Sequence, residues 1–162
     1  MIPFEHGLRE ILSQPTCIVG VGNLMRNDDA VGVMIADRLG QDLPALNGAS
    51  VVLAEDVIEN HVFRIAEGDA RNVLVIDAVE ADAEAGSVVL GKLEDLEKVA
   101  NNGFSTHKLA LSTAGSILKH YGKDVYLLGI VAANTDYGTE VSQEILDSAE
   151  TVIDLVRANS KE

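Results

Sequence analysis

The chain has 162 residues, 47% hydrophobic and 23% charged, which is typical of a globular protein and favours one domain over residues 1–162. Its 26 acidic and 12 basic residues give a formal net charge of −14, which disfavours nucleic acid and anionic membranes as partners. No apolar run approaches the ~20 residues of a membrane span, and the N-terminus lacks a signal-peptide pattern. The single cysteine, Cys17, cannot form an internal disulfide. We therefore expect a cytoplasmic protein.

Apolar runs of strand length alternate with stretches of helical periodicity along the chain. The first of these is a helix over residues 3–13, with Pro3 in its first turn. The elements expected after it are strand 16–22, helix 30–40, strand 50–55, helix 57–67, strand 72–78, strand 87–92, helix 108–121, strand 125–132 and helix 142–158.

This order predicts an α/β fold, a three-layer α/β/α sandwich with a five-stranded, mostly parallel twisted sheet. Strand 87–92 follows strand 72–78 too closely for a crossover helix, so we expect one antiparallel edge strand. Function is expected in the longest irregular segments, because loops held by a rigid scaffold carry most binding and catalytic residues. These segments are 23–29, 79–86, 100–107 and 133–141.

The first predicted strand ends in a glycine turn that two aspartates follow. Gly20 and Gly22 begin a dinucleotide-type turn, but the third glycine is missing from its usual place. Asp28 and Asp29 stand instead at the start of the next helix, where both would repel a phosphate. A helix cap explains one of them, so the pair argues against nucleotide binding.

Two further candidate ligands lie downstream. Asp77 ends a strand after four apolar residues, and it meets the aspartate pair if strands 16–22 and 72–78 are neighbours. Carboxylates that close need a shared proton or a cation. Taken alone, Asp77 is explained equally well as a solvated turn cap. His107 precedes helix 108–121, whose N-terminus keeps the ring neutral and available to a metal, although a surface histidine in a cap sequence is the simpler interpretation.

Taken together, these motifs resemble the maturation endopeptidases of [NiFe] hydrogenases, which remove a C-terminal tail from the hydrogenase large subunit. The resemblance runs from about Cys17 to the C-terminal helix, and it implies that residues 1–15 are an extra N-terminal helix or extension. The matching residues are Gly20-x-Gly22-Asn23, Asp28-Asp29, Gly32, the Val-Ile-Asp-Ala ending at Asp77-Ala78, Thr106-His107 and Leu128-Gly129-Ile130.

The resemblance implies that Asp29, Asp77 and His107 are metal ligands and catalytic residues, with Asp28 as a further catalytic candidate. It also implies that nickel comes with the large-subunit precursor, that only loaded precursor is cleaved, and that the site of the isolated protein can be empty. Water polarised by the metal or activated by a carboxylate would attack the scissile carbonyl. We expect the peptidase to be a monomer.

Two other functions stay open at this point. A non-catalytic metal- or small-molecule-binding accessory protein of metalloenzyme maturation would share the glycine loop and the charge, but it would not need Asp29 and His107 to meet. A nucleotide-binding regulator rests only on Gly20-x-Gly22 and is the weakest alternative. The distances among Asp29, Asp77 and His107 are the most informative observation, because metal ligands must lie within ~5–6 Å of a common point.

Overall fold

The computed structural model describes residues 3–42, 49–99, 105 and 107–160. Its strands are β1 (Thr16–Val21), β2 (Ser50–Glu55), β3 (Asn72–Val79), β4 (Val88–Lys92) and β5 (Asp124–Val131). Its helices are α1 (Glu5–Leu12), α2 (Val31–Gly40), α3 (Val62–Glu67), α4 (Leu93–Val99), α5 (Lys108–His120) and α6 (Gln143–Asn159), with short 3₁₀ helices η1 (Asn27–Ala30) and η3 (Ile58–Asn60).

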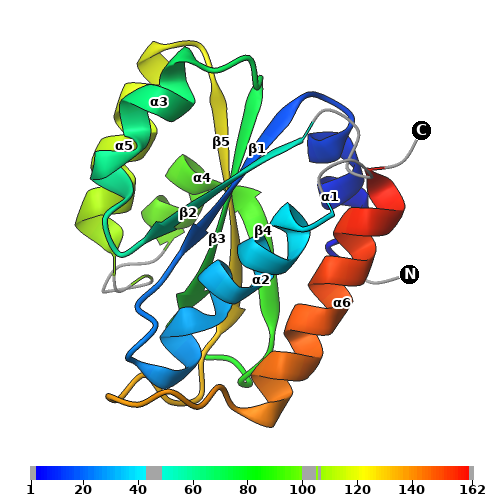
Figure 1. The fold of residues 1–162 in the computed structure, drawn as a ribbon, viewed down its shortest axis with the longest axis vertical. Helices are drawn as coiled ribbons and strands as arrows, with labels where there is room; N and C mark the ends of the chain where they lie inside the picture. The colour runs from blue at the N-terminus through cyan, green and yellow to red at the C-terminus, as the bar shows by residue number, and fades with distance from the viewer. Residues whose placement is uncertain (1–2, 43–48, 100–104, 106, 161–162) are drawn as a thin grey trace.

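The five strands form one sheet in the order β2-β1-β3-β5-β4. The pairs β1–β2, β1–β3 and β3–β5 are parallel, while β4 pairs antiparallel with β5 at one edge, as the short connection predicts. Helices α1, α2 and α6 lie on one side of the sheet and α3, α4 and α5 on the other (Figure 1). The predicted three-layer α/β/α arrangement is therefore confirmed.

Both faces of the central strands are buried. In β3, Leu74 and Ile76 belong to the core under α2 and α6, whereas Val73 and Val75 belong to the core under α3 and α5. Successive side chains of a strand point to opposite faces, so a strand covered on both sides must be apolar throughout. Cys17 of β1 is part of the second core, as its place in an apolar run indicates.

Helix α2 packs unusually close to the sheet at Gly32. A Cβ atom at this position would lie 2.1 Å from the carbonyl oxygen of Ile76 and 2.4 Å from that of Val21. Only a glycine fits where a helix approaches two strand ends this closely. Gly32 thus allows the helix–strand packing that the third glycine allows in a dinucleotide-binding turn.

Several boundaries differ from the sequence prediction. Helix α1 begins at Glu5, and Pro3 lies in a turn before it instead of in its first turn. The helix expected over 57–67 is divided into η3 and α3, because His61 between them leaves ideal helical geometry. Helix α4 was not predicted, since it begins directly after β4 and its seven residues are too short to show a helical period.

The N-terminal residues are part of this packing. Leu8 and Ile11 of α1 are buried in the same core as α6, and Arg9 donates a hydrogen bond to Asn159. That residues 1–15 lie outside a common family core stays a prediction. No helix within the described residues combines the length and the apolar character that crossing a membrane requires.

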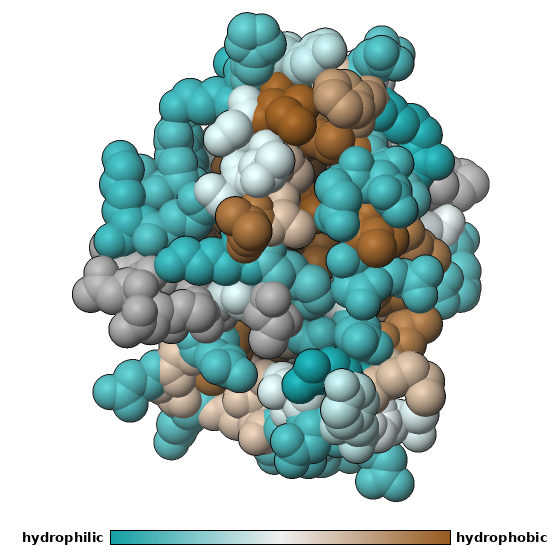
Figure 2. Space-filling view, turned by 90° about the vertical axis from the view of Figure 1, so that its left-hand side faces the viewer, coloured by the Kyte–Doolittle hydropathy of each residue, from teal (hydrophilic) through white to brown (hydrophobic). Residues whose placement is uncertain are grey.

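The outer surface of the α3–α5 layer is partly apolar. Figure 2 shows hydrophobic residues gathered in the upper half of this face, between hydrophilic ones. Two aromatic residues here are about half exposed, Phe63 of α3 and Tyr121 directly after α5. Their rings pack edge to face with centroids 6.5 Å apart, a contact within the chain.

Candidate functional site

Three residues far apart in the sequence meet at the carboxyl ends of β1 and β3. Asp29 lies in η1 after β1, Asp77 lies in β3, and His107 directly precedes α5. One potential ligand atom from each lies within 4.8 Å of the others. The chain passes from β1 outward to β2 and then back across to β3, so this is the reversal point where α/β sheets bind ligands. The convergence predicted for these residues is confirmed.

Asp77 is fully buried, and its two carboxylate oxygens have different surroundings. Oδ2 accepts a hydrogen bond from the Ser105 hydroxyl at 2.5 Å and lies 3.3 Å from Nδ1 of His107. Oδ1 has no hydrogen-bond partner among the described residues. Burial raises the pKa of the Asp77 carboxyl, although the bonds to His107 and Ser105 oppose this effect. An unsatisfied buried oxygen costs free energy, so this carboxylate suits a cation.

His107 is oriented by the acids on both sides of its ring. Nδ1 faces Asp77, and Nε2 lies 3.9 Å from Oδ2 of Asp29. Burial alone would lower the pKa of His107, but the hydrogen bond to Asp77 and the charges of Asp77, Asp29 and Asp56 outweigh it and raise the pKa. Asp56, in the loop after β2, is an acid near the site that the sequence did not single out.

Asp29 is held by the glycine turn that precedes it. Its Oδ2 accepts a hydrogen bond from the backbone N–H of Asn23 at 2.9 Å, and its side chain is almost completely buried. The backbone of Gly22 passes so close that a Cβ atom there would lie 2.0 Å from the carbonyl oxygen of Asp29. The turn therefore wraps around a carboxylate, where a dinucleotide-binding turn would wrap around a phosphate.

Asp28 is buried as well, but its carboxylate contacts a different part of the chain. Its oxygens accept hydrogen bonds from the backbone N–H groups of Ala133, Asn134 and Ser142 and from the Ser142 hydroxyl, at 2.6–3.0 Å. The carboxylate anchors the loop between β5 and α6, which corrects its interpretation as a cap of the following helix. Ser142 is the N-cap residue of α6, but its hydroxyl bonds Asp28 instead of its own helix. A catalytic role of Asp28 stays a prediction.

Backbone hydrogen bonds join the loop after β1 to the loop after β5. The N–H of Asn27 donates to the carbonyl of Gly138, and the N–H of Gly138 donates to the carbonyl of Met25, both at 2.9 Å. The Arg26 side chain donates to a carbonyl of the second loop and lies 5.0 Å from the centre of the Tyr137 ring. The two loops thus form one fixed border beside Asp29.

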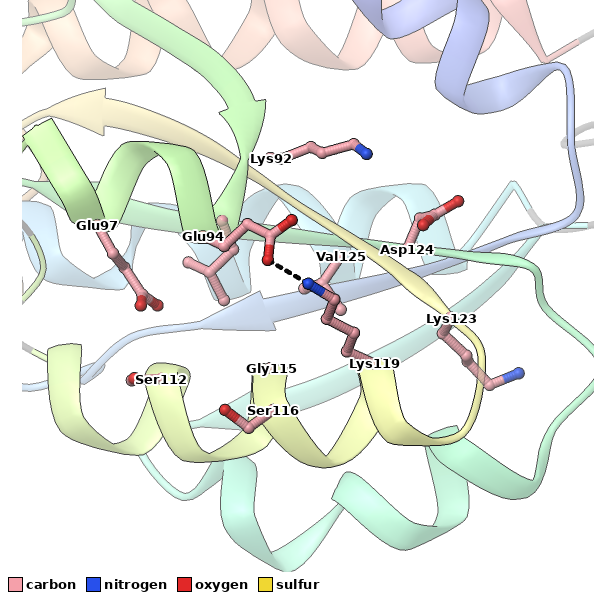
Figure 3. A pocket seen from close by; sticks show the side chains of 11 residues that line it. Lys92, Glu94, Glu97, Ser112, Gly115, Ser116, Lys119, Lys123, Asp124 and Val125 are labelled. Carbon is pink, nitrogen blue, oxygen red and sulfur yellow. Dashed lines mark hydrogen bonds and ion pairs between the residues drawn. The ribbon is translucent and has the colours of Figure 1, made fainter.

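A hollow lies between α4, α5 and the beginning of β5 (Figure 3). Its charged side chains are partly paired, since Nζ of Lys119 lies 2.6 Å from Oε2 of Glu94. Asp124, which also lines it, is the first residue of β5, whereas the acid–histidine cluster lies at the opposite, carboxyl end of the strands. This hollow is therefore separate from the candidate metal site.

Metal binding to the cluster is expected to strengthen as the pH rises. Because the pKa of His107 is raised, its ring keeps a proton at pH values above about 6.5, the ordinary pKa of histidine. A cation must displace that proton. The dissociation constant for Ni²⁺ should therefore fall as the pH increases through the range above about 6.5, with proton release on binding. Calorimetry in buffers of different ionisation enthalpy measures both quantities.

The matched control for this pH dependence is His6→Ala, because His6 is exposed on α1 and pairs only with Glu10 among the described residues. It should keep the pH dependence, while His107→Ala should lose it. An affinity for Ni²⁺ that stays constant across this pH range would show that His107 is not a ligand.

Comparison with known proteins agrees with this geometry. Residues 49–159 match the family model described as hydrogenase maturation protease, HycI. This range includes Asp77 and His107, and Asp29 precedes it. The chain is 28% identical over 143 residues to MJ0631 of Methanocaldococcus jannaschii, which is provisionally named a hydrogenase maturation protease; the match covers 84% of this chain and 82% of the relative.

Solved structures give the same result. The [NiFe] hydrogenase maturation protease HycI from Thermococcus kodakarensis superimposes with a TM-score of 0.79 at 25% identity, over 96% of this chain and 99% of the other. The endopeptidase HycI from Escherichia coli gives a TM-score of 0.73 at 25% identity, over 88% and 89%. The maturating endopeptidase HybD from E. coli, at 19% identity and a TM-score of 0.72 over 87% and 88%, shows a shared fold.

Proposed function

Because the chain belongs to the hydrogenase maturation protease family, and is thus a hydrolase, we propose that it removes the C-terminal extension of a [NiFe] hydrogenase large-subunit precursor after nickel insertion. The observation that carries this proposal is the meeting of Asp29, Asp77 and His107, with potential ligand atoms within 4.8 Å of one another. In the proposed reaction, nickel is part of the substrate, and this acid–histidine cluster recognises it.

The donor set supports recognition of a metal that other groups already hold. Imidazole nitrogen is a suitable ligand for nickel, and three protein ligands leave further coordination positions for ligands from the precursor. A precursor without nickel would present no cation to the two carboxylates. The free energy of binding would then favour the loaded precursor, and this difference makes cleavage conditional on nickel insertion.

Hydrolysis also requires a group that takes a proton from the attacking water. Nε2 of His107 and Oδ2 of Asp29 lie 3.9 Å apart, which is too far for a hydrogen bond between them and leaves room for a third group that contacts both. We assign proton transfer to Asp29 and orientation of His107 to Asp77. Asp28 contributes by anchoring the loop after β5, which borders the site.

Exposed apolar side chains beside the site support a protein substrate. We call Leu24, Met25 and Tyr137 the apolar rim; they are 47%, 61% and 82% exposed. The hydrogen bonds between their loops hold them in place before any partner binds, which reduces the entropy lost on docking. Methionine and aromatic residues are enriched in protein–protein interfaces. Binding of a free metal ion or a small anion would not require exposed apolar side chains.

The remaining features of the proposal are a monomeric peptidase, a cytoplasmic location and no nucleic-acid partner. The net charge of −14 supports the last of these, because such a surface repels a phosphate backbone.

The test is to mix the protein with a nickel-loaded large-subunit precursor and to measure the precursor mass. We expect the loaded precursor to lose a C-terminal peptide and the nickel-free precursor to keep its full mass. If the loaded precursor also keeps its full mass but binds the protein, the chain is a metal-binding accessory protein and the proposed peptidase function is wrong.

A further inference from the structure

Ser105 lies inside the acid–histidine cluster, although its place in the sequence predicted no role for it. The residue is 6% exposed, and its hydroxyl makes two hydrogen bonds to described residues. It donates to Oδ2 of Asp77 at 2.5 Å and accepts from the backbone N–H of His107 at 3.0 Å. One buried hydroxyl therefore connects two of the three candidate ligands.

The directions of these hydrogen bonds follow from the chemistry of the groups. A backbone N–H can only donate, so the Ser105 oxygen is the acceptor toward His107. The single hydroxyl proton is then available to the Asp77 carboxylate, which accepts. Both bonds are satisfied together when Asp77 is ionised, and the hydroxyl has no proton left for any other acceptor.

The position of Ser105 is set by the backbone as well as by these bonds. An isolated antiparallel bridge pairs Ser105 with Val79, the last residue of β3. Asp77 and Val79 are two residues apart in the strand, so their side chains point to the same face of the sheet. The bridge thus holds the hydroxyl beside Asp77, on the side of the sheet where α5 begins.

The arrangement also determines which nitrogen of His107 is available. Nδ1 faces the same Asp77 oxygen that Ser105 contacts, at 3.3 Å, and a carboxylate there selects the ring form with the proton on Nδ1. The lone pair is then on Nε2, which faces Asp29. On the Asp77 side, Oδ2 is used by Ser105 and His107, and Oδ1, which has no hydrogen-bond partner among the described residues, is left for a cation.

We propose that Ser105 is a positioning residue of the site: its hydroxyl joins Asp77 to the start of α5 and thereby fixes His107 with Nε2 toward the metal. Ser105 itself contacts neither the metal nor the scissile bond. This role of Ser105 belongs to the same site as the proposed function, and it rests on that function only where processing is measured.

A serine-nucleophile mechanism does not fit the same residues. In a Ser/His/Asp triad the histidine contacts the serine through one ring nitrogen and the aspartate through the other. Here the Ser105 hydroxyl and Nδ1 of His107 both contact Oδ2 of Asp77, and Nε2 of His107 faces Asp29. Within the described residues, the His107 ring faces Asp77 and Asp29 and is not arranged as the base of a triad.

The test compares Ser105→Ala, Ser105→Thr and the control Ser116→Ala, which removes an exposed hydroxyl from α5. For Ser105→Ala we expect a Ni²⁺ affinity about 10–100-fold lower, as for other groups that orient metal ligands. Nitrogen-15 NMR of the His107 ring in the metal-free protein, recorded at a pH where the ring is neutral, should show the loss of a single Nδ1-protonated form. Threonine keeps the hydroxyl, so Ser105→Thr should restore both properties, and Ser116→Ala should leave both unchanged.

The metal affinity and the ring spectrum are measured without a precursor, so they test Ser105 even if the proposed peptidase function fails. Where processing is observed, Ser105→Ala should lower kcat/KM for the nickel-loaded precursor, and Ser105→Thr should restore it. The proposal would be overturned if the Ser105→Ala protein had the wild-type unfolding temperature, the wild-type Ni²⁺ affinity and the wild-type His107 ring spectrum. A Ser105→Thr protein that folds but restores neither property would also overturn it.

Discussion

Replacement of Asp77 by asparagine is expected to reduce precursor processing by roughly 10–100-fold, the usual cost of losing a group that orients a metal ligand. Asparagine keeps the shape of the side chain but removes the charge that a cation requires. Its carbonyl oxygen can still accept the bonds that Ser105 and His107 make to one oxygen of Asp77, but its NH₂ group then stands where the other oxygen was left for a cation. The rate at which the C-terminal peptide is released from nickel-loaded precursor, measured by mass spectrometry, gives the effect.

The matched control is Asp124→Asn, which removes an acid from the opposite end of the same sheet, where it pairs with Arg71 at the surface. It should retain the wild-type processing rate. Asp29→Asn and His107→Ala should resemble Asp77→Asn, and all three proteins should keep the wild-type circular-dichroism spectrum. Full processing by all three would mean that the cluster is not the active site.

Gly32→Ala is expected to destabilise the protein by about 3 kcal/mol or more, at the upper end of the range for overpacked cores. The added methyl group would lie 2.1 Å from the carbonyl oxygen of Ile76 and 2.4 Å from that of Val21. Both atoms belong to the sheet backbone and cannot rotate away as a side chain could, so α2 must move outward. Urea unfolding followed by circular dichroism measures the change in the free energy of unfolding.

Gly40→Ala provides the control within the same helix. A Cβ atom at Gly40 would have its nearest contact, 3.6 Å, with a methyl group of Val51, which is an ordinary van der Waals distance. Alanine is also the better helix former, so this variant should be as stable as the wild type or slightly more stable. Equal stability of Gly32→Ala and Gly40→Ala would contradict the close approach of α2 to the sheet.

The layers and strand directions could be predicted because they depend on simple patterns. Strands that are apolar throughout indicate a sheet covered on both faces, and the short connection after β3 requires an antiparallel neighbour. Asp77, His107 and the Asp28–Asp29 pair could be named as candidates because each stands at the end of a strand or the start of a helix, where α/β sheets collect ligands. The family resemblance then selected Asp29 from the pair. The meeting of Asp29, Asp77 and His107 depended on β1 and β3 being neighbours, which the structure confirms.

The role of Asp28 could not be predicted, because its hydrogen-bond partners lie 105 to 114 residues away in a loop with no regular pattern. A local interpretation as a helix cap was the simplest one available for it. Ser105 was missed for a related reason, since its function depends on the backbone bridge to Val79. Periodicity and motif spacing carry no information about such long-range contacts.

The anchoring of Asp28 also fixes an order of events during synthesis of the protein. A chain leaves the ribosome from its N-terminus, so Asp29, Asp77 and His107 are all made before Ser142. The loop that carries Asp28 gains its bonds to Ala133, Asn134 and Ser142 only when that later segment has emerged. The candidate metal ligands are therefore all synthesised before the last anchor of the loop that borders them.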